Sequence, residues 1–181
     1  MNAQVKSRER VAAHGEVFTA EREVKAMCDL VDDECRKYDS TFLEPACGDG
    51  NFLAEILSRK LNAIAQDPDY ERKSLIALSS LYGVDILPDN VTACQKRLCQ
   101  IWQASGEHSQ TALDQATRIL HFNIVCGDSL NPETIIFSEW TFPEDSIVPE
   151  RKEVNLREVF YAIEQAEKVK ESGQGVFNFT T

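Results

Sequence analysis

The sequence predicts a single α/β domain with a mostly parallel sheet and helices on both faces of that sheet. Short apolar segments typical of buried strands alternate along the chain with stretches whose apolar residues recur at helical spacing. A turn with two glycines, "EPACGDG", joins the first of these strands directly to a helix. The chain has 181 residues, 43% hydrophobic and 27% charged, which is enough for one domain with a substantial core.

The first half of the chain supplies one strand and three helices. Thr19 has the character of an N-cap, and the apolar spacing after it predicts a helix over about 20–38. "TFLEP" predicts a short buried strand that ends at Pro45, and the apolar positions over 52–64 mark the next helix. Asp67-Pro68 is typical of a cap followed by the first helical residue, so we expect a further helix over about 67–80.

The next segments continue the alternation. "LYGVDIL" predicts a second strand over 81–87, and Pro88 opens a third long helix. After the polar loop "SGEHSQ" we expect a short helix around 110–119. "HFNIVCGD" (121–128) and "TIIF" (134–137) predict the third and fourth strands.

The last segments predict a loop, a helix and a strand. Residues 141–151 contain two prolines and many charges and are typical of a loop, and the apolar spacing over 154–172 predicts a long helix. "GQG" then turns the chain into a last strand, "VFNFT". We expect an N-terminal helical segment over 1–40 and an α/β core over 41–181, together one compact domain.

Composition limits the classes of function. The 19 basic and 30 acidic residues give a net charge of −11, which argues against DNA binding by this chain alone. No apolar run is long enough for a membrane span, and the charged N-terminus shows no signal peptide, so we expect a cytoplasmic protein without membrane contact. The six cysteines form no CxxC pair and are expected to be buried thiols, with no metal site.

The glycine turn is the first candidate for a binding site. Gly48 and Gly50 let the backbone approach a ligand closely at the N-terminus of a helix. A dinucleotide site favours a third glycine where this chain has Leu53, and no Lys-Ser/Thr pair follows as in a P-loop. Glu44 ends the strand before the turn. A carboxylate at this place suits a ligand with an ammonium group better than a pyrophosphate.

Two further acids follow the next two predicted strands. Asp85 ends the second strand, where an acid commonly accepts hydrogen bonds from ribose hydroxyls. Asp128 ends the third strand, where it would lie near an adenine. Because the carboxyl ends of parallel strands meet at one edge of a sheet, Glu44, Asp85 and Asp128 are expected to converge on one site. The alternative is three solvated acids in strand-end loops.

Five segments, in order, resemble the N6-adenine DNA methyltransferases of restriction-modification systems. "FLEPACGDGNFL" resembles their motif I, which binds S-adenosylmethionine. "HGEVFTAEREVKAMCDLV" resembles motif X, placed N-terminal to motif I as in that subclass. "YGVDILPDNVTACQKRL", "NIVCGDSL" and "VKESGQGVFNFTT" resemble motifs II, III and VI. The resemblance covers nearly the whole chain and implies a Rossmann-like, S-adenosylmethionine-dependent methyltransferase fold.

The resemblance also implies which residues hold S-adenosylmethionine. The motif X turn closes over the methionine end of the cofactor, Glu44 faces its charged end, Asp85 takes the ribose and Asp128 lies near the adenine. The implied cofactor-binding residues are Val17, Phe18, Thr19, Glu44, Pro45, Ala46, Cys47, Gly48, Gly50, Asn51, Phe52, Asp85, Ile86 and Asp128.

The chain departs from the family at the catalytic motif. The family's fourth strand ends in Asn/Asp-Pro-Pro-Tyr/Phe, which holds the amino group of a flipped adenine, and no such tetrapeptide occurs here. If "TIIF" is that strand, Ser138, Glu139 and Trp140 lie in the place of the catalytic loop. Trp140 then either stacks on a base, with Ser138 or Glu139 accepting a hydrogen bond, or packs locally. We also expect the family's C-terminal antiparallel hairpin and target-recognition region to be missing.

These observations leave three hypotheses. The first is a subunit or fragment of an adenine-specific DNA methyltransferase that binds S-adenosylmethionine and needs a partner, in a homo- or hetero-oligomer, for DNA recognition and catalysis. The second is a non-catalytic relative that binds the cofactor or a partner. The third is methylation of another substrate, such as a protein or small molecule, in a rebuilt pocket around Trp140.

Overall fold

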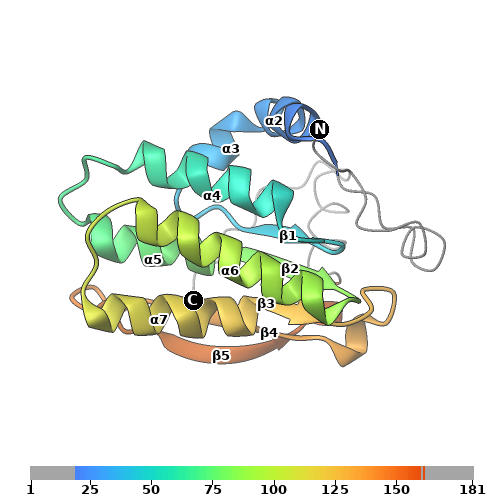
Figure 1. The fold of residues 1–181 in the computed structure, drawn as a ribbon. Coiled ribbons are helices and arrows are strands. Elements are labelled where there is room, and N and C mark those ends of the chain that lie inside the picture. The colour runs from blue at the N-terminus through green and yellow to red at the C-terminus, as the bar shows by residue number, and fades with distance from the viewer. Residues whose placement is uncertain (1–18, 160, 162–181) are drawn as a thin grey trace, which may run out of the picture.

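The centre of the fold is a three-stranded parallel sheet. A computed structural model of the chain describes residues 19–159 and 161. Strands β1 (Phe42–Glu44), β2 (Leu81–Asp85) and β3 (Ile124–Cys126) lie side by side in the order β1-β2-β3 (Figure 1). Their parallel pairing confirms the predicted α/β class, and β2, the middle strand, pairs with both neighbours.

Two helices connect each pair of neighbouring strands. Helices α4 (Asn51–Ala63) and α5 (Tyr70–Ser79) lie between β1 and β2 in the chain. Helices α6 (Pro88–Ala104) and α7 (Gln110–Asn123) lie between β2 and β3. Parallel neighbours need such crossovers because a tight turn reverses the chain direction.

The alternation of side chains along β2 divides the core between the two faces of the sheet. Leu81 is buried among the helices, and Gly83 faces α4, where an added Cβ would lie 3.0 Å from the Leu53 side chain. Tyr82 and Val84 point to the opposite face and pack in a second, smaller cluster. This period of two is the expected geometry of a strand covered on both faces.

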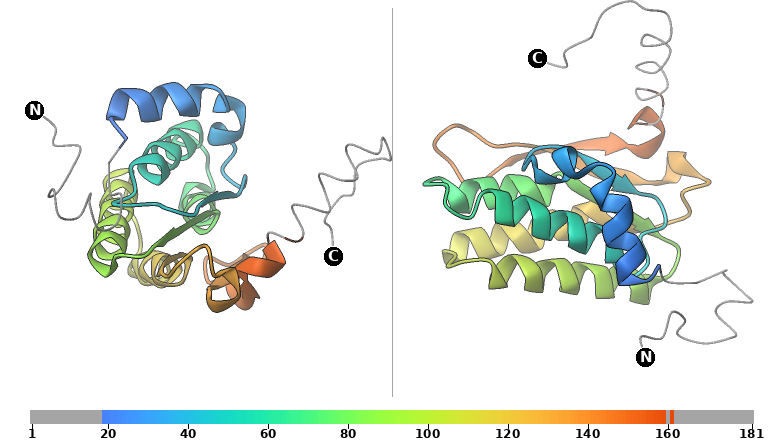
Figure 2. Two further views of the ribbon diagram at one scale, coloured as in Figure 1. Left: turned by 90° about the vertical axis from the view of Figure 1, so that its right-hand side faces the viewer. Right: turned by 90° about the horizontal axis from the view of Figure 1, so that it is seen from above.

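An antiparallel hairpin covers the second face, where we had expected helices. Strands β4 (Ile136–Thr141) and β5 (Glu150–Asn155) form a sheet of their own (Figure 2). Phe137 of β4 belongs to the same buried cluster as Val84 of β2. Leu156, the first residue of the helix after β5, completes this cluster. The fourth strand predicted over 134–137 is present as β4, shifted toward 141, but it pairs antiparallel with β5 instead of joining the parallel sheet. The prediction of a loop throughout 141–151 was wrong, because β4 ends at Thr141 and β5 begins at Glu150.

Helix boundaries differ from the predictions in physically simple ways. Helix α5 begins at Tyr70 because the Asp67 carboxylate accepts the Asp69 N–H at 2.9 Å and makes a turn first. Helix α7 extends to Asn123, so the predicted strand over 121–128 is reduced to β3. The predicted helix over 154–172 begins at Leu156, and most of it lies outside the described residues, as does the predicted strand over 176–180.

The N-terminal helical segment is broken in two. The predicted helix over 20–38 is α2 (Glu21–Asp29) followed by α3 (Asp32–Arg36), and its N-cap is Ala20 rather than Thr19. Arg59 of α4 binds the carboxylates of Asp29 at 2.7 Å and Asp32 at 2.6 Å. Because these two acids flank the break, Arg59 holds both short helices on α4.

The cysteines are all free thiols, and four of them are buried as predicted. The exceptions are Cys99, which is partly exposed, and Cys126, which is exposed at the end of β3. In the part of the chain that the structure describes, no helix has the length and apolar character of a membrane span.

Lys60 of α4 is a fully buried cation that joins the N-terminal segment to the core. Its ammonium donates to the carbonyl oxygens of Lys37 at 2.7 Å, Tyr38 at 3.3 Å and Ser40 at 2.6 Å. Burial lowers the pKa of Lys60 to about 8, and three carbonyl acceptors match the three N–H donors of the protonated form. The loop that leads into β1 is thus fixed from inside the protein.

Replacing Lys60 with methionine is expected to destabilise the fold strongly. Lys60→Met keeps the apolar stem but leaves three carbonyl groups without their donor, so the free energy of unfolding should fall by about 2–4 kcal/mol. Lys73→Met is the matched control, because the Lys73 ammonium pairs with Asp67 near the surface and should contribute less than about 1 kcal/mol. Urea unfolding measures both; equal losses would contradict the role of Lys60.

Candidate functional site

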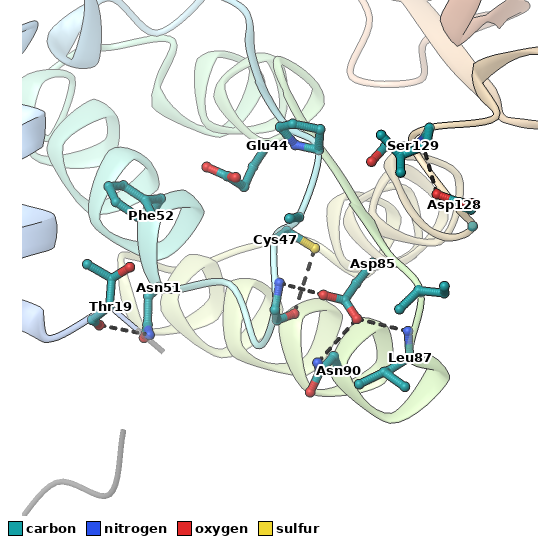
Figure 3. A pocket seen from close by; sticks show the side chains of 16 residues that line it. Thr19, Glu44, Cys47, Asn51, Phe52, Asp85, Leu87, Asn90, Asp128 and Ser129 are labelled. Atoms are coloured by element: carbon teal, nitrogen blue, oxygen red, sulfur yellow. Dashed lines mark hydrogen bonds between the residues drawn. The ribbon is translucent and has the colours of Figure 1, made fainter. Parts of the chain in front are cut away.

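A cleft of about 470 Å³ lies at the carboxyl ends of the three parallel strands. It is formed by the turn after β1, the first turn of α4 and the segments that follow β2 and β3 (Figure 3). The predicted site residues that line it are Thr19, Glu44, Pro45, Ala46, Cys47, Gly48, Asn51, Phe52, Asp85, Ile86 and Asp128. Glu44, Asp85 and Asp128 therefore meet at one site, as their positions after successive strands predicted.

Three predicted site residues are not among the described residues that line the cleft. Val17 and Phe18 lie outside the described residues. Gly50 lies in the turn but not in the cleft lining. Its backbone has a φ of 88°, and a Cβ there would lie 2.6 Å from the Cys94 sulfur of α6. Gly50 is thus required by the left-handed turn and by the close approach of α6, rather than by contact with a ligand.

Asp85 is the centre of the hydrogen bonding at the cleft. One carboxylate oxygen accepts the Gly48 N–H at 2.9 Å. The other accepts the Leu87 N–H at 2.9 Å and the Asn90 amide at 3.2 Å (Figure 3). The Asp85 carbonyl also accepts the Gly127 N–H at 3.0 Å. One residue at the end of β2 therefore fixes the turns that follow all three strands.

These contacts limit what Asp85 can offer to a ligand. A carboxylate has about four acceptor positions, and three protein donors already occupy most of them. About one position remains for a ligand hydroxyl. Asp85 is first a structural acceptor for the turn, and any ribose contact adds to that role.

Gly48 and Gly83 allow the turn to pack against the sheet although the third glycine of a dinucleotide-binding turn is absent. Gly48 has a φ of 54°, a left-handed conformation that lets its N–H reach Asp85. The position of the missing third glycine is held by Leu53, which is buried against Gly83 of β2. A Cβ on Gly83 would lie 3.0 Å from both the Leu53 side chain and the Cys47 sulfur. The glycine that permits close packing is on the strand instead of the helix.

Glu44 provides a partly buried carboxyl group at the edge of the cleft. Its side chain points from the end of β1 toward Phe52 (Figure 3). Burial raises the pKa of Glu44, while a hydrogen bond from the Ala46 backbone partly opposes this effect. A cationic ligand group placed here would lower that pKa again, so the site favours an ammonium.

The turn after β3 forms the remaining side of the cleft, and hydrogen bonds within the turn hold its shape. The Asp128 carboxylate accepts the Leu130 N–H at 3.0 Å and the Asn131 amide at 2.7 Å. Five further residues line the cleft that were not predicted from the sequence: Leu87, Asn90, Gly127, Ser129 and Leu130. Each lies within five positions of a predicted acid, and Asn90 faces Asp85 because Pro88 begins α6 immediately after β2.

The charged side chains that line the described part of the cleft are all acidic. Among the described residues, its ionisable carboxyl groups are Glu44, Asp85 and Asp128, and no lysine, arginine or histidine lines it. The pKa of the Cys47 thiol is raised by its hydrogen bond with Cys94 and by burial, so Cys47 stays protonated. The cleft is therefore suited to a neutral or cationic ligand with hydroxyl donors, and its three carboxylates disfavour a phosphate.

The residues expected near the catalytic loop lie elsewhere. Ser138, Glu139 and Trp140 are inside β4, paired with β5, and none of them lines the cleft. The Trp140 indole donates to the Asn123 side chain at 2.8 Å, and the Arg118 guanidinium lies 5.1 Å from its ring centroid. This is the local packing that was the alternative to base stacking.

Ser138 is buried and Glu139 is exposed. The Ser138 hydroxyl accepts a hydrogen bond from the Arg151 guanidinium at 2.6 Å, and the Ser138 carbonyl accepts one from the Tyr82 hydroxyl at 2.9 Å.

Comparisons with protein-family models, curated proteins and solved structures found no match. The functional interpretation therefore depends on the residues of the cleft and on the order of the motifs.

Replacing Asp85 should affect folding more than replacing Asp128. Asp85→Asn puts an amide N–H₂ against a backbone donor, and we expect the free energy of unfolding to fall by about 1–3 kcal/mol. Asp128→Asn changes contacts inside an exposed turn, where water can substitute, and should cost less than about 1 kcal/mol. Denaturant unfolding of both variants measures the difference. Equal losses in the free energy of unfolding would contradict the central role of Asp85 in the turns.

Proposed function

We propose that the chain binds S-adenosylmethionine in this cleft as the cofactor-binding part of an adenine-N6 DNA methyltransferase. In this proposal another polypeptide supplies the Asn/Asp-Pro-Pro-Tyr/Phe motif and the DNA-reading surface. The observation that carries the cofactor assignment is a glycine turn at the carboxyl ends of parallel strands, surrounded by three acids and, among the residues that the structure describes, by no basic side chain. The DNA substrate rests on the ordered resemblance of motifs X, I, II, III and VI.

The chemistry of the cofactor fits the lining. S-adenosylmethionine supplies a methyl group on a positively charged sulfur, and it also carries an ammonium, a carboxylate and a ribose with two hydroxyls, so its net charge is positive. Glu44 suits the ammonium, and the remaining acceptor position of Asp85 suits a ribose hydroxyl. Ile86 and Leu130 line the cleft although they are 55% and 88% exposed, so covering them with an adenine ring would bury apolar surface.

A non-catalytic relative is the second candidate, and one observation favours it. Ser138 and Trp140 are held by Arg151 and Asn123 in the hairpin, so they are not free to act on a substrate at the cleft. In this case the chain binds the cofactor as a sensor or as part of an interaction with a partner. The same packing makes a rebuilt catalytic pocket around Trp140 the weakest of the three hypotheses.

Calorimetry with the full chain tests the cofactor assignment. We expect S-adenosylmethionine to bind and NAD⁺, which carries a pyrophosphate, not to bind, because the carboxylates of Glu44, Asp85 and Asp128 repel a pyrophosphate. Asp128→Ala should weaken binding without unfolding the protein, since Asp128 bonds mainly within its own turn. Failure of S-adenosylmethionine to bind the wild-type chain would overturn the proposal.

A methyl-transfer assay separates the two candidates. Labelled S-adenosylmethionine is incubated with DNA and the purified chain, alone and with the polypeptide that completes the enzyme. Transfer only in the completed enzyme supports the methyltransferase subunit. Transfer by the chain alone would contradict both candidates as stated, and binding without transfer in any combination would favour the non-catalytic relative.

The affinity for S-adenosylmethionine should depend on pH through Glu44. Because burial raises the pKa of Glu44, its carboxyl becomes neutral at a higher pH than an ordinary glutamate, and affinity should fall as the pH is lowered through that pKa. Glu44→Gln should bind about 10- to 100-fold more weakly at neutral pH, as expected for one charge-assisted hydrogen bond, and should lose this pH dependence. An unchanged pH profile in the variant would exclude Glu44 as the ammonium partner.

A further inference from the structure

We infer that Arg97 of α6 is a positioning residue that fixes the wall of the cleft at Thr19 by holding the Asn51 side chain. This inference rests on the proposed function, because it concerns how the cleft holds S-adenosylmethionine. Arg97 does not itself line the cleft. Thr19 and Asn51 both do, and they come from segments 32 positions apart in the chain.

A short chain of contacts connects the three residues. The Arg97 guanidinium donates to the Asn51 side-chain oxygen at 2.6 Å. It also lies 3.3 Å from the carbonyl oxygen and 3.3 Å from a carboxylate oxygen of Asp49. The Asn51 amide nitrogen then donates to the Thr19 carbonyl at 3.4 Å. In Figure 3 Thr19 and Asn51 lie together at one side of the cleft.

The chemistry of the two side chains fixes the direction of the amide. A guanidinium has only donors, whereas the Asn51 amide has one acceptor oxygen and one donor nitrogen. Arg97 therefore holds the oxygen and turns the nitrogen toward Thr19. The reverse orientation would set the amide N–H₂ against the guanidinium and leave no donor for the Thr19 carbonyl. Without Arg97, both orientations of Asn51 become accessible.

Electrostatics and positioning predict opposite effects of removing Arg97. A positive charge near an acidic cleft repels a cationic ligand, so losing that charge alone should strengthen binding of S-adenosylmethionine. Loss of the wall at Thr19 should weaken it. The sign of the change therefore shows which effect dominates.

The control is the neighbouring residue on the same helix. Lys96 is exposed and does not line the cleft, so Lys96→Met removes one positive charge and leaves Asn51 in place. Arg97→Lys retains one donor for the Asn51 oxygen and should restore part of the loss. In an Asn51→Ala background, Arg97→Met should weaken binding no further, because its route to Thr19 is already broken, and only the small tightening from the lost charge should remain.

Calorimetry of the full chain with S-adenosylmethionine gives the first readout. We expect Arg97→Met to raise the Kd about 5- to 10-fold, the size of one ordinary hydrogen bond, and Lys96→Met to leave it unchanged or slightly lower. Equal or tighter binding by Arg97→Met, with thermal unfolding unchanged, would overturn the inference.

Amide hydrogen exchange over Thr19–Asp29 gives a second readout that needs no ligand. Exchange there should be faster in Arg97→Met than in the wild type or Lys96→Met, while exchange in β2 stays unchanged. If the wild-type chain fails to bind S-adenosylmethionine, the proposed function fails, but this comparison still decides whether Arg97 holds the segment. Identical exchange in all three proteins would overturn the inference.

Discussion

The carboxylate of Asp85 is the contact on which the candidate site depends. It accepts the Gly48 N–H from the turn after β1 and the Leu87 N–H from the start of α6, while the backbone carbonyl of Asp85 accepts the Gly127 N–H from the turn after β3. A parallel sheet aligns its strands but does not by itself fix the loops that follow them. Here one residue on the middle strand joins those loops through its side chain and its backbone, and the shape of the cleft depends on these bonds.

Close packing imposes the second constraint. Gly50 allows the Cys94 sulfur of α6 to approach the start of α4, and Gly83 allows Leu53 and Cys47 to approach β2. A methyl group at either glycine would displace a helix, because protein interiors have few voids to absorb it. Gly50 and Gly83 therefore set how closely α4 packs against α6 and against β2, whereas Gly48 and Gly127 line the cleft.

The predictable part of the structure is the part with local signals. Strands β1 to β3 and the helices between them follow apolar periodicity, proline and glycine, and the three acids follow from their places after the strands. The hairpin was missed because "TIIFSEW" has the same pattern in a parallel or an antiparallel strand. Its partner β5, "ERKEVN", is too charged to read as a strand, and it forms through pairing with β4, supported by the Arg151–Ser138 contact.

The negative charge of the cleft and of the whole chain suits a cationic cofactor but not the phosphates of DNA. The three acids that suit S-adenosylmethionine would repel phosphates at the same place, and the net charge of −11 offers no general attraction to a duplex. Trp140, the aromatic residue expected near a base, is instead fixed to Asn123, whose amide also donates to the carbonyls of Ser79 and Leu81. Freeing Trp140 would break the hydrogen bond by which Asn123 connects the hairpin to the end of α5 and the start of β2. Under the proposed function, a partner therefore has to contribute the basic surface that contacts DNA.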